Sequence, residues 1–213
     1  MQRSLALITL TVFLQPLATP ARPRTGSHSA ATTSSVIRLH DGRNTIDLLG
    51  AGDSGVVDVA DRENFNAHGS HVAIFQLLAH TIPRDRSSAV EWQVLPFFGG
   101  IADSVTGTEV FRTVEGADCT LRDLRIVRSN PKQPVEIVVA ERELGASFAD
   151  PAPVEFHYYE LRTNTDGVVG WPAYYFAHTR VVRARQRYCD VDDAFDRELH
   201  LGRAGMLKWE GPV

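Results

Sequence analysis

Hydrophobic and polar residues alternate along most of this chain, and a period of two is typical of β-strands with one buried face. Early in the pattern, Val57 and Val59 are expected to point to one side and Asp58 to the other. A polar break at 64–69 separates this run from a second alternating run at 71–78. The pattern predicts two strands that are joined by a polar turn.

Further strands are predicted at short intervals, separated by turns rich in Gly, Pro and Asn. They occupy residues 90–94, 124–128, 135–139, 154–160 and 173–184. Near the C-terminus the period changes to that of a helix, in which Asp190 caps a hydrophobic stripe of Val191, Phe195 and Leu199. The expected fold class is all-β, an antiparallel β-sandwich with a short C-terminal helix.

The first residues differ from this pattern. Residues 1–21 are expected to be a signal peptide, because Arg3 precedes the apolar run 5–14 and small residues follow it. The run is shorter than the about 20 residues of a membrane-spanning helix, so an uncleaved membrane anchor is the less favoured alternative. Residues 22–35 are rich in Ser, Thr and Ala and are expected to form a flexible tether, which leaves 36–213 as one domain. We therefore expect a periplasmic or secreted protein that has no membrane contact after cleavage.

The charge of the chain restricts its partners. The whole chain has a formal net charge of −4, and removal of Arg3 with the signal peptide leaves −5. Proteins that bind nucleic acid need a basic surface, so no nucleic-acid partner is expected. No cofactor is expected either, apart from the cation considered below.

Two cysteines, Cys119 and Cys189, are the complete set in this chain. In an exported protein they are expected to form a disulfide, and two buried free thiols are the alternative. Closing a loop of about 70 residues in this way stabilises a fold by on the order of 4 kcal/mol.

An acidic, glycine-punctuated loop precedes the first predicted strand. Asp47, Gly52 and Asp58 stand at the first, sixth and twelfth positions of a calcium-loop pattern, but Leu49 and Ala51 stand where oxygen ligands are expected. The favoured interpretation is an ordinary turn. The alternative is a weakly bound cation such as calcium, with Asp47 and Asp58 as its side-chain ligands.

The same loop contains Gly52-Asp53-Ser54-Gly55, which is similar to the nucleophile motifs of trypsin-like proteases and of one class of serine esterases. A serine nucleophile needs a base within hydrogen-bond reach, and the chain offers no histidine and aspartate at the spacing of either family. We therefore expect a protein that is not an enzyme and a serine that belongs to a turn. A secreted serine esterase is the less favoured alternative.

Several segments together resemble the carbapenem intrinsic resistance family, the CarG-like proteins, over roughly residues 45–200. The segments are D-L-L-G-A-G at 47–52, R-E-N-F-N-A-H at 62–68, W-Q-V-L-P-F at 92–97, A-E-R-E-L-G-A-S-F-A-D at 140–150, G-W-P-A-Y-Y-F at 170–176 and Y-C-D-V at 188–191. The resemblance implies a periplasmic, non-enzymatic, homodimeric β-sandwich that protects against a carbapenem by a mechanism not understood. It also implies an associated cation site and a fold similar to periplasmic lysozyme inhibitors.

The family resemblance leaves two binding functions open. One is protection against a β-lactam through an unknown periplasmic protein or a β-lactam-related target. The other is a lysozyme-inhibitor-like binding protein, although Ser54 and Gly55 are not followed by the tyrosine that the inhibitory loop carries.

The turn at 64–68 is the most specific piece of the resemblance. Asn64, Asn66 and His68 are candidates for a binding surface, because loops on a rigid sandwich commonly carry binding residues. The alternative is that these side chains hydrogen-bond the backbone of their own turn and serve stability alone.

Overall fold

The structure is a computed structural model that describes residues 34–52, 55–63, 69–80, 90–99, 107–116, 118–165 and 171–205. The chain divides into two compact units, Met1–Ala31 and Thr32–Val213, and all described residues belong to the second. The signal peptide and most of the expected tether therefore lie outside the described residues. Within the described residues, no helix is long and apolar enough to cross a membrane.

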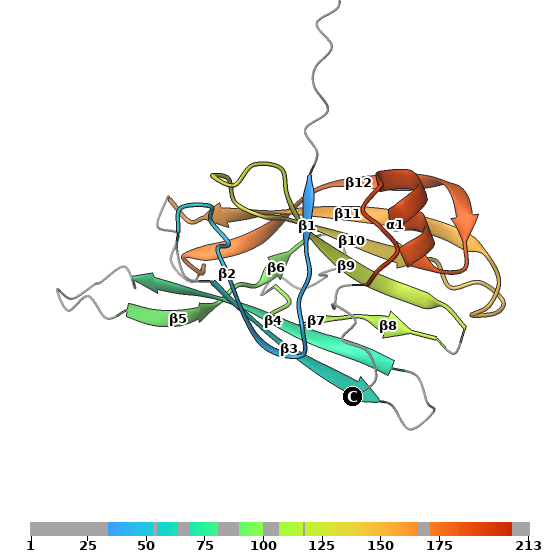
Figure 1. Cartoon of the computed structure of the whole chain (residues 1–213), viewed down its shortest axis with the longest axis horizontal. Coiled ribbons are helices and arrows are strands. Elements are labelled where there is room, and N and C mark those ends of the chain that lie inside the picture. Colours follow the sequence, from blue (N-terminus) through green and yellow to red (C-terminus); the bar gives the residue numbers. More distant parts are fainter. Residues whose placement is uncertain are drawn as a thin grey trace, which may run out of the picture. The chain divides into compact units, whose positions relative to one another are not determined.

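Two β-sheets make up the second unit (Figure 1). The larger has seven strands: β1 (Ser35–Ile37), β9 (Thr120–Arg128), β10 (Glu136–Arg142), β11 (Ala152–Thr163), β12 (Tyr174–Tyr188) and β6 (Phe97–Phe98) in that order, with β8 (Val114–Glu115) also paired to β9. The smaller has five: β2 (Gly42–Ile46), β3 (Gly55–Glu63), β4 (Gly69–His80) and β5 (Val90–Val94) in order, with β7 (Phe111–Arg112) also paired to β4.

The pairing confirms the expected antiparallel sandwich. The described strand pairs are antiparallel except for the short parallel pair of β12 and β6. Several boundaries differ from the sequence expectation. β9 starts at Thr120 instead of 124, and β10 and β11 extend beyond their expected ends to Arg142 and Thr163. β1 starts at Ser35, the last residue of the expected tether, and β12 continues four residues beyond 184 to Tyr188. Alternation alone does not mark these ends because strand ends are decided by the pairing partner.

Aliphatic and aromatic side chains from both sheets fill the space between them. Val57 and Val59 of β3 are buried there, as the alternation predicts. Three phenylalanines form the centre, where the Phe97 ring centroid lies 5.5 Å from that of Phe75 and 4.7 Å from that of Phe176. Aromatic pairs at such distances stabilise a fold beyond the area they bury.

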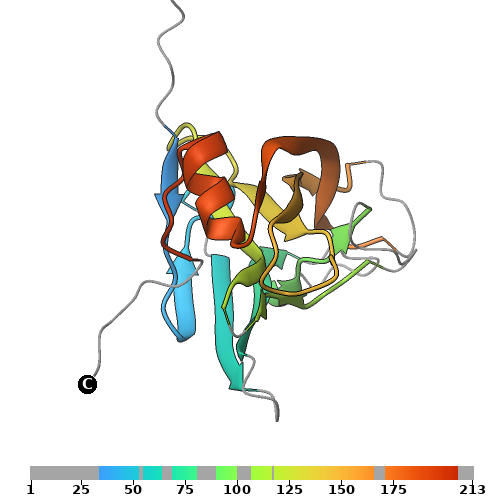
Figure 2. The same ribbon diagram turned by 90° about the vertical axis from the view of Figure 1, so that its right-hand side faces the viewer.

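The other face of the larger sheet is covered by α1 (Val191–Leu199), as Figure 2 shows. Val191 and Phe195 of the predicted stripe are fully buried against this face, and Leu199 packs at its edge. The predicted cap is confirmed, because the Asp190 side chain accepts a hydrogen bond of 2.8 Å from the Asp192 backbone amide. Because α1 takes this place, the part of the larger sheet that it covers is buried on both faces, whereas much of β12 stays exposed.

The predicted disulfide is present and joins the start of β9 to the end of β12. Cys119 directly precedes β9 and Cys189 directly follows β12, two residues before α1, and their Cα atoms are 5.7 Å apart across the bond. The alternative of free thiols is wrong for this pair.

Candidate functional site

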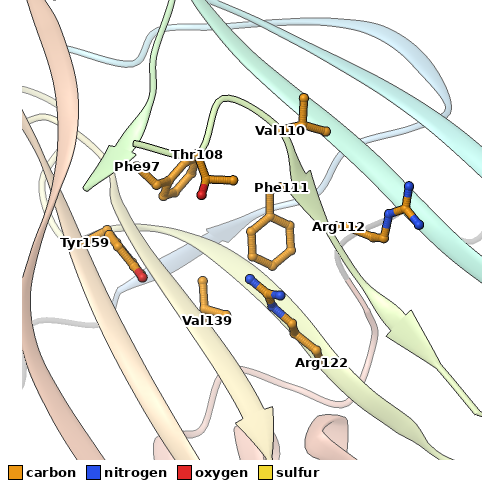
Figure 3. Close-up of a pocket in the computed structure, with 8 residues that line it drawn as sticks. All are labelled: Phe97, Thr108, Val110, Phe111, Arg112, Arg122, Val139 and Tyr159. Carbon is orange, nitrogen blue, oxygen red and sulfur yellow. The ribbon is translucent and has the colours of Figure 1, made fainter. Parts of the chain in front are cut away.

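A pocket of about 190 Å³ opens between the two sheets where the central core ends (Figure 3). Eight residues line it: Phe97, Thr108, Val110, Phe111, Arg112, Arg122, Val139 and Tyr159. They come from β6, β7, β9, β10, β11 and the segment before β7, so only the tertiary fold brings them together.

The alternation of the strands directs these side chains inward. Leu124 and Ile126 of β9 are buried between the sheets, so Arg122, two residues before Leu124, lies on the same face. In β10, Val139 pairs with Leu124 and extends the same surface. From the smaller sheet, Phe111 of β7 faces this surface and closes the pocket from the opposite side (Figure 3).

Arg122 carries the main electrostatic feature of the pocket. Its guanidinium lies over the Phe111 ring, 5.0 Å from the ring centroid, and its Nε is buried without a hydrogen-bond partner in the described part of the chain. Leaving a buried donor without an acceptor costs about 1–3 kcal/mol. The side chain is therefore positioned to gain from an anionic acceptor.

The remaining polar residues of the pocket lining are Arg112, Thr108 and Tyr159. Arg112 is exposed at the rim, and the Tyr159 hydroxyl donates a 3.2 Å hydrogen bond to the Gly99 carbonyl. Thr108 is held by two backbone hydrogen bonds of 2.9 Å to Phe97. The eight lining residues include no carboxylate, imidazole or thiol. The described lining thus has the groups to bind an anion, and none of its eight residues is an ordinary general base.

Two histidines lie next to Tyr159 on β11 and β12. The His157 and His178 ring centroids are 5.4 Å apart, and that of His178 is 5.2 Å from Tyr159. Burial lowers the pKa of both imidazoles below the ordinary value, and repulsion from His178 lowers that of His157 further. Both rings therefore favour the neutral form and add no fixed positive charge beside the pocket.

The first predicted oxygen ligand, Asp47, is used by its own turn. Its carboxylate accepts hydrogen bonds from the backbone amides of Gly50 at 2.8 Å and Gly52 at 3.2 Å. Both glycines have positive φ, 74° and 81°, as the acidic loop requires. This arrangement supports the interpretation of the segment as a turn.

The second predicted ligand, Asp58, lies on β3 opposite Arg43. It accepts hydrogen bonds of 2.9 and 3.1 Å from Arg43 and one of 2.7 Å from Gln76. The hydrogen bond from Arg43 holds the pKa of Asp58 below its ordinary value. Asp58 lies three strand positions, about 10 Å, from Gly55. Gly55 pairs with Ile46, the residue before Asp47, so Asp58 is far along the strand from the Asp47 turn.

The structure therefore does not bring the two predicted oxygen ligands, Asp47 and Asp58, to one point. Among the described residues, no group of three or more His, Cys, Asp or Glu side chains could hold a metal ion. Calcium binding by this segment stays a prediction that the geometry does not favour.

Four further sites of the sequence analysis lie outside the described residues: Ser54, Asn64, Asn66 and His68. The hairpin that carries the last three is present, because Glu63 at the end of β3 pairs with Gly69 at the start of β4. The binding surface on that turn and the serine of the less favoured esterase both stay predictions.

The pocket and the buried Arg125 and Arg142 were not predicted from the sequence. The inward direction of Arg122 could have been predicted, since it shares the two-residue period of Leu124 and Ile126. Arg125 is fully buried and joins Asp123 and Asp192, each at 2.6 Å. No local signal reveals that contact, because the helix that supplies Asp192 lies 67 residues further along the chain.

Arg142 organises the loop that follows β10. It is 3% exposed and donates to the backbone carbonyls of Ser147, Phe148, Asp150 and Cys189 at 3.2, 3.0, 2.7 and 3.3 Å. This loop is the A-E-R-E-L-G-A-S-F-A-D segment of the family resemblance, so a buried structural role accounts for its arginine.

Comparison with known proteins agrees with the sequence resemblance. A solved structure titled "Crystal structure of CarG" superposes with a TM-score of 0.60 and 19% identity, over 76% of this chain and 94% of that chain. At that identity the likeness shows a shared fold. No curated protein matches the chain. The family described as "Carbapenem resistance protein CarG-like" matches residues 39–197, and the chain therefore belongs to this CarG-like family.

Proposed function

We propose that this protein is exported and lowers the effect of a carbapenem by binding, without hydrolysing the antibiotic. Membership of the CarG-like family supports the link to carbapenems. The observation that carries the binding mechanism is the pocket between the sheets, whose polar lining consists of two arginines, a threonine and a tyrosine. Arginine stays protonated and does not serve as a base, so such a lining favours retention of an anion over its hydrolysis.

Export is proposed on the expected signal peptide at 1–21 together with the disulfide between Cys119 and Cys189. Disulfides persist in oxidising compartments such as the bacterial periplasm. The protein would then act in the periplasm, where β-lactams meet their targets, and it would act there as a homodimer.

The test is a resistance assay with a matched compartment control. The full chain and a version that lacks residues 1–21 are expressed in a carbapenem-sensitive Gram-negative host at equal abundance. We expect a higher inhibitory concentration only with the exported form. Purified protein mixed with the antibiotic should leave the ring absorbance of the β-lactam unchanged over many equivalents. Absence of protection, or turnover of the antibiotic, would overturn the proposal.

The turn at 64–68 is a rival location for the binding surface. In the same host, Asn66→Ala and His68→Ala are compared with the natural chain at matched abundance and melting temperature. Loss of protection with either variant would move the binding surface from the pocket to the turn. A lysozyme panel and an esterase assay with Ser54→Ala address the two alternative functions, and we expect no effect in either.

A further inference from the structure

We propose that the pocket between the sheets recognises a small carboxylate, with the anion on Arg122 and a compact apolar body between the two sheets. The identity of the natural ligand as a β-lactam acid rests on the proposed function. The recognition of a carboxylate by Arg122 rests on the geometry of the pocket.

The Arg122 guanidinium differs from the other buried guanidinium groups in its partners. Four arginines have a buried Nε without a partner in the described part of the chain: Arg122, Arg125, Arg128 and Arg142. The other three all donate from their terminal nitrogens to carboxylate or carbonyl oxygens. Arg122 has no such hydrogen bond among the described residues and is in contact with the Phe111 ring instead.

The geometry of a guanidinium matches that of a carboxylate. A planar guanidinium presents parallel N–H donors that fit the two oxygens of a carboxylate. The Phe111 ring covers one face of the Arg122 group, so a planar acceptor is favoured at its edge. Partial burial reduces screening by water and strengthens such a pair relative to one on the open surface.

The size and chemistry of the remaining space suit a small ligand. The pocket holds about 190 Å³, and its walls include Phe97, Phe111, Val139 and the ring of Tyr159. A cavity of about 150 Å³ accommodates benzene, so this one admits a molecule of one or two small rings. A second positive group, Arg112, lies at the rim and attracts an approaching anion.

The test uses the purified mature chain and three probes: the free acid of a bicyclic carbapenem, its methyl ester and benzoate. Affinity is measured by isothermal titration and by ligand-observed NMR. We expect the acid to bind and the ester to bind at least about tenfold more weakly, because esterification removes the charge.

Two variants assign the effect to a residue. Arg122→Gln should weaken binding of the acid by on the order of tenfold to a hundredfold and abolish the preference for acid over ester. Arg197→Gln is the matched control, because it removes the same charge from the exposed surface of α1. Arg122→Lys keeps the positive charge without the parallel pair of N–H donors, so it should retain part of the affinity. This variant separates recognition of the carboxylate from a loss of folding.

The outcomes separate the two proposals. Binding of benzoate through Arg122 without binding of the carbapenem acid would keep the carboxylate site and contradict the proposed function. Equal binding of acid and ester, no binding of either acid at millimolar concentration, or an Arg122→Gln variant with unchanged affinity would overturn the carboxylate site.

Discussion

The ion cluster beneath α1 predicts a specific dependence of stability on pH. Asp192 lies in the first turn of α1, and its carboxylate is 2.6 Å from the buried guanidinium of Arg125. Burial, followed by repulsion from Asp123, raises the pKa of Asp192 to about 6, and the attraction of Arg125 offsets this only in part. The perturbation we consider is Asp192→Asn, whose amide oxygen can still accept from Arg125.

The sign of the effect follows from where the proton is held. The pKa of Asp192 is about 6 in the folded protein and about 3.9 in the unfolded chain, so between these pH values the folded state holds a proton that the unfolded state releases. The free energy of unfolding therefore falls as pH rises from about 4 to above 6. The difference between the two pKa values corresponds to a loss of about 3 kcal/mol in the free energy of unfolding. The asparagine variant does not show this loss, because its side chain does not titrate.

Urea unfolding at pH 4, 5, 6 and 7, followed by tryptophan fluorescence, measures this difference. The free energy of unfolding of Asp192→Asn, relative to that of the natural chain, should rise by about 3 kcal/mol between the lowest and the highest pH. The control is Asp193→Asn, which removes a carboxylate of the same helical turn that pairs with the exposed Arg203. The reasoning would be refuted if the difference in free energy of unfolding between the natural chain and Asp192→Asn stayed constant over the pH range.

Three further results are expected from the described contacts. Arg142→Met should lower the free energy of unfolding by about 3 kcal/mol and speed proteolysis within 143–151, because four carbonyls lose their buried donor; cleavage at the natural rate would contradict this role. Replacing Cys119 and Cys189 by Ser should cost on the order of 4 kcal/mol, and the unfolded, unreduced natural chain should titrate no thiol. Titration with calcium to about 1 mM should leave the melting temperature unchanged, and a rise of more than about 2 °C that Asp47→Asn or Asp58→Asn removes would show that the acidic loop binds the ion.

Local patterns were sufficient for the longer strands from β3 onwards and for α1, whereas β1, β2 and the short β6, β7 and β8 were not predicted. Val57 and Val59 alternate with Asp58, and burial of one strand face by the opposite sheet produces that period. Asp190 before Val191 and Phe195 predicts both the cap and the buried stripe of α1, because the hydrogen bond and the stripe involve neighbours within two turns. The family motifs likewise identified a CarG-like chain, and the match over 39–197 confirms them.

The second buried face of the larger sheet was not evident from the sequence. In β10, Val138 alternates with Ile137 and Val139 and points away from the core that takes up these two, yet it is 1% exposed because α1 covers that side. Alternation distinguishes the two faces of a strand, but it does not show whether the outer face is exposed to water or covered by a helix.

The pocket and the ion cluster were decided by tertiary structure alone. Arg122 faces Phe111 and Tyr159 because the register of β9, β10 and β11 and the packing of one sheet on the other place three separate strands around one space. Arg125 meets Asp192 only because α1 folds back onto the sheet. The sequence by itself determined which residues face inward, since that depends on the backbone period. Strand register and sheet packing decide which inward residues meet, and they leave Arg122 without an oxygen partner among the residues that the structure describes. Both are set by contacts between distant parts of the chain.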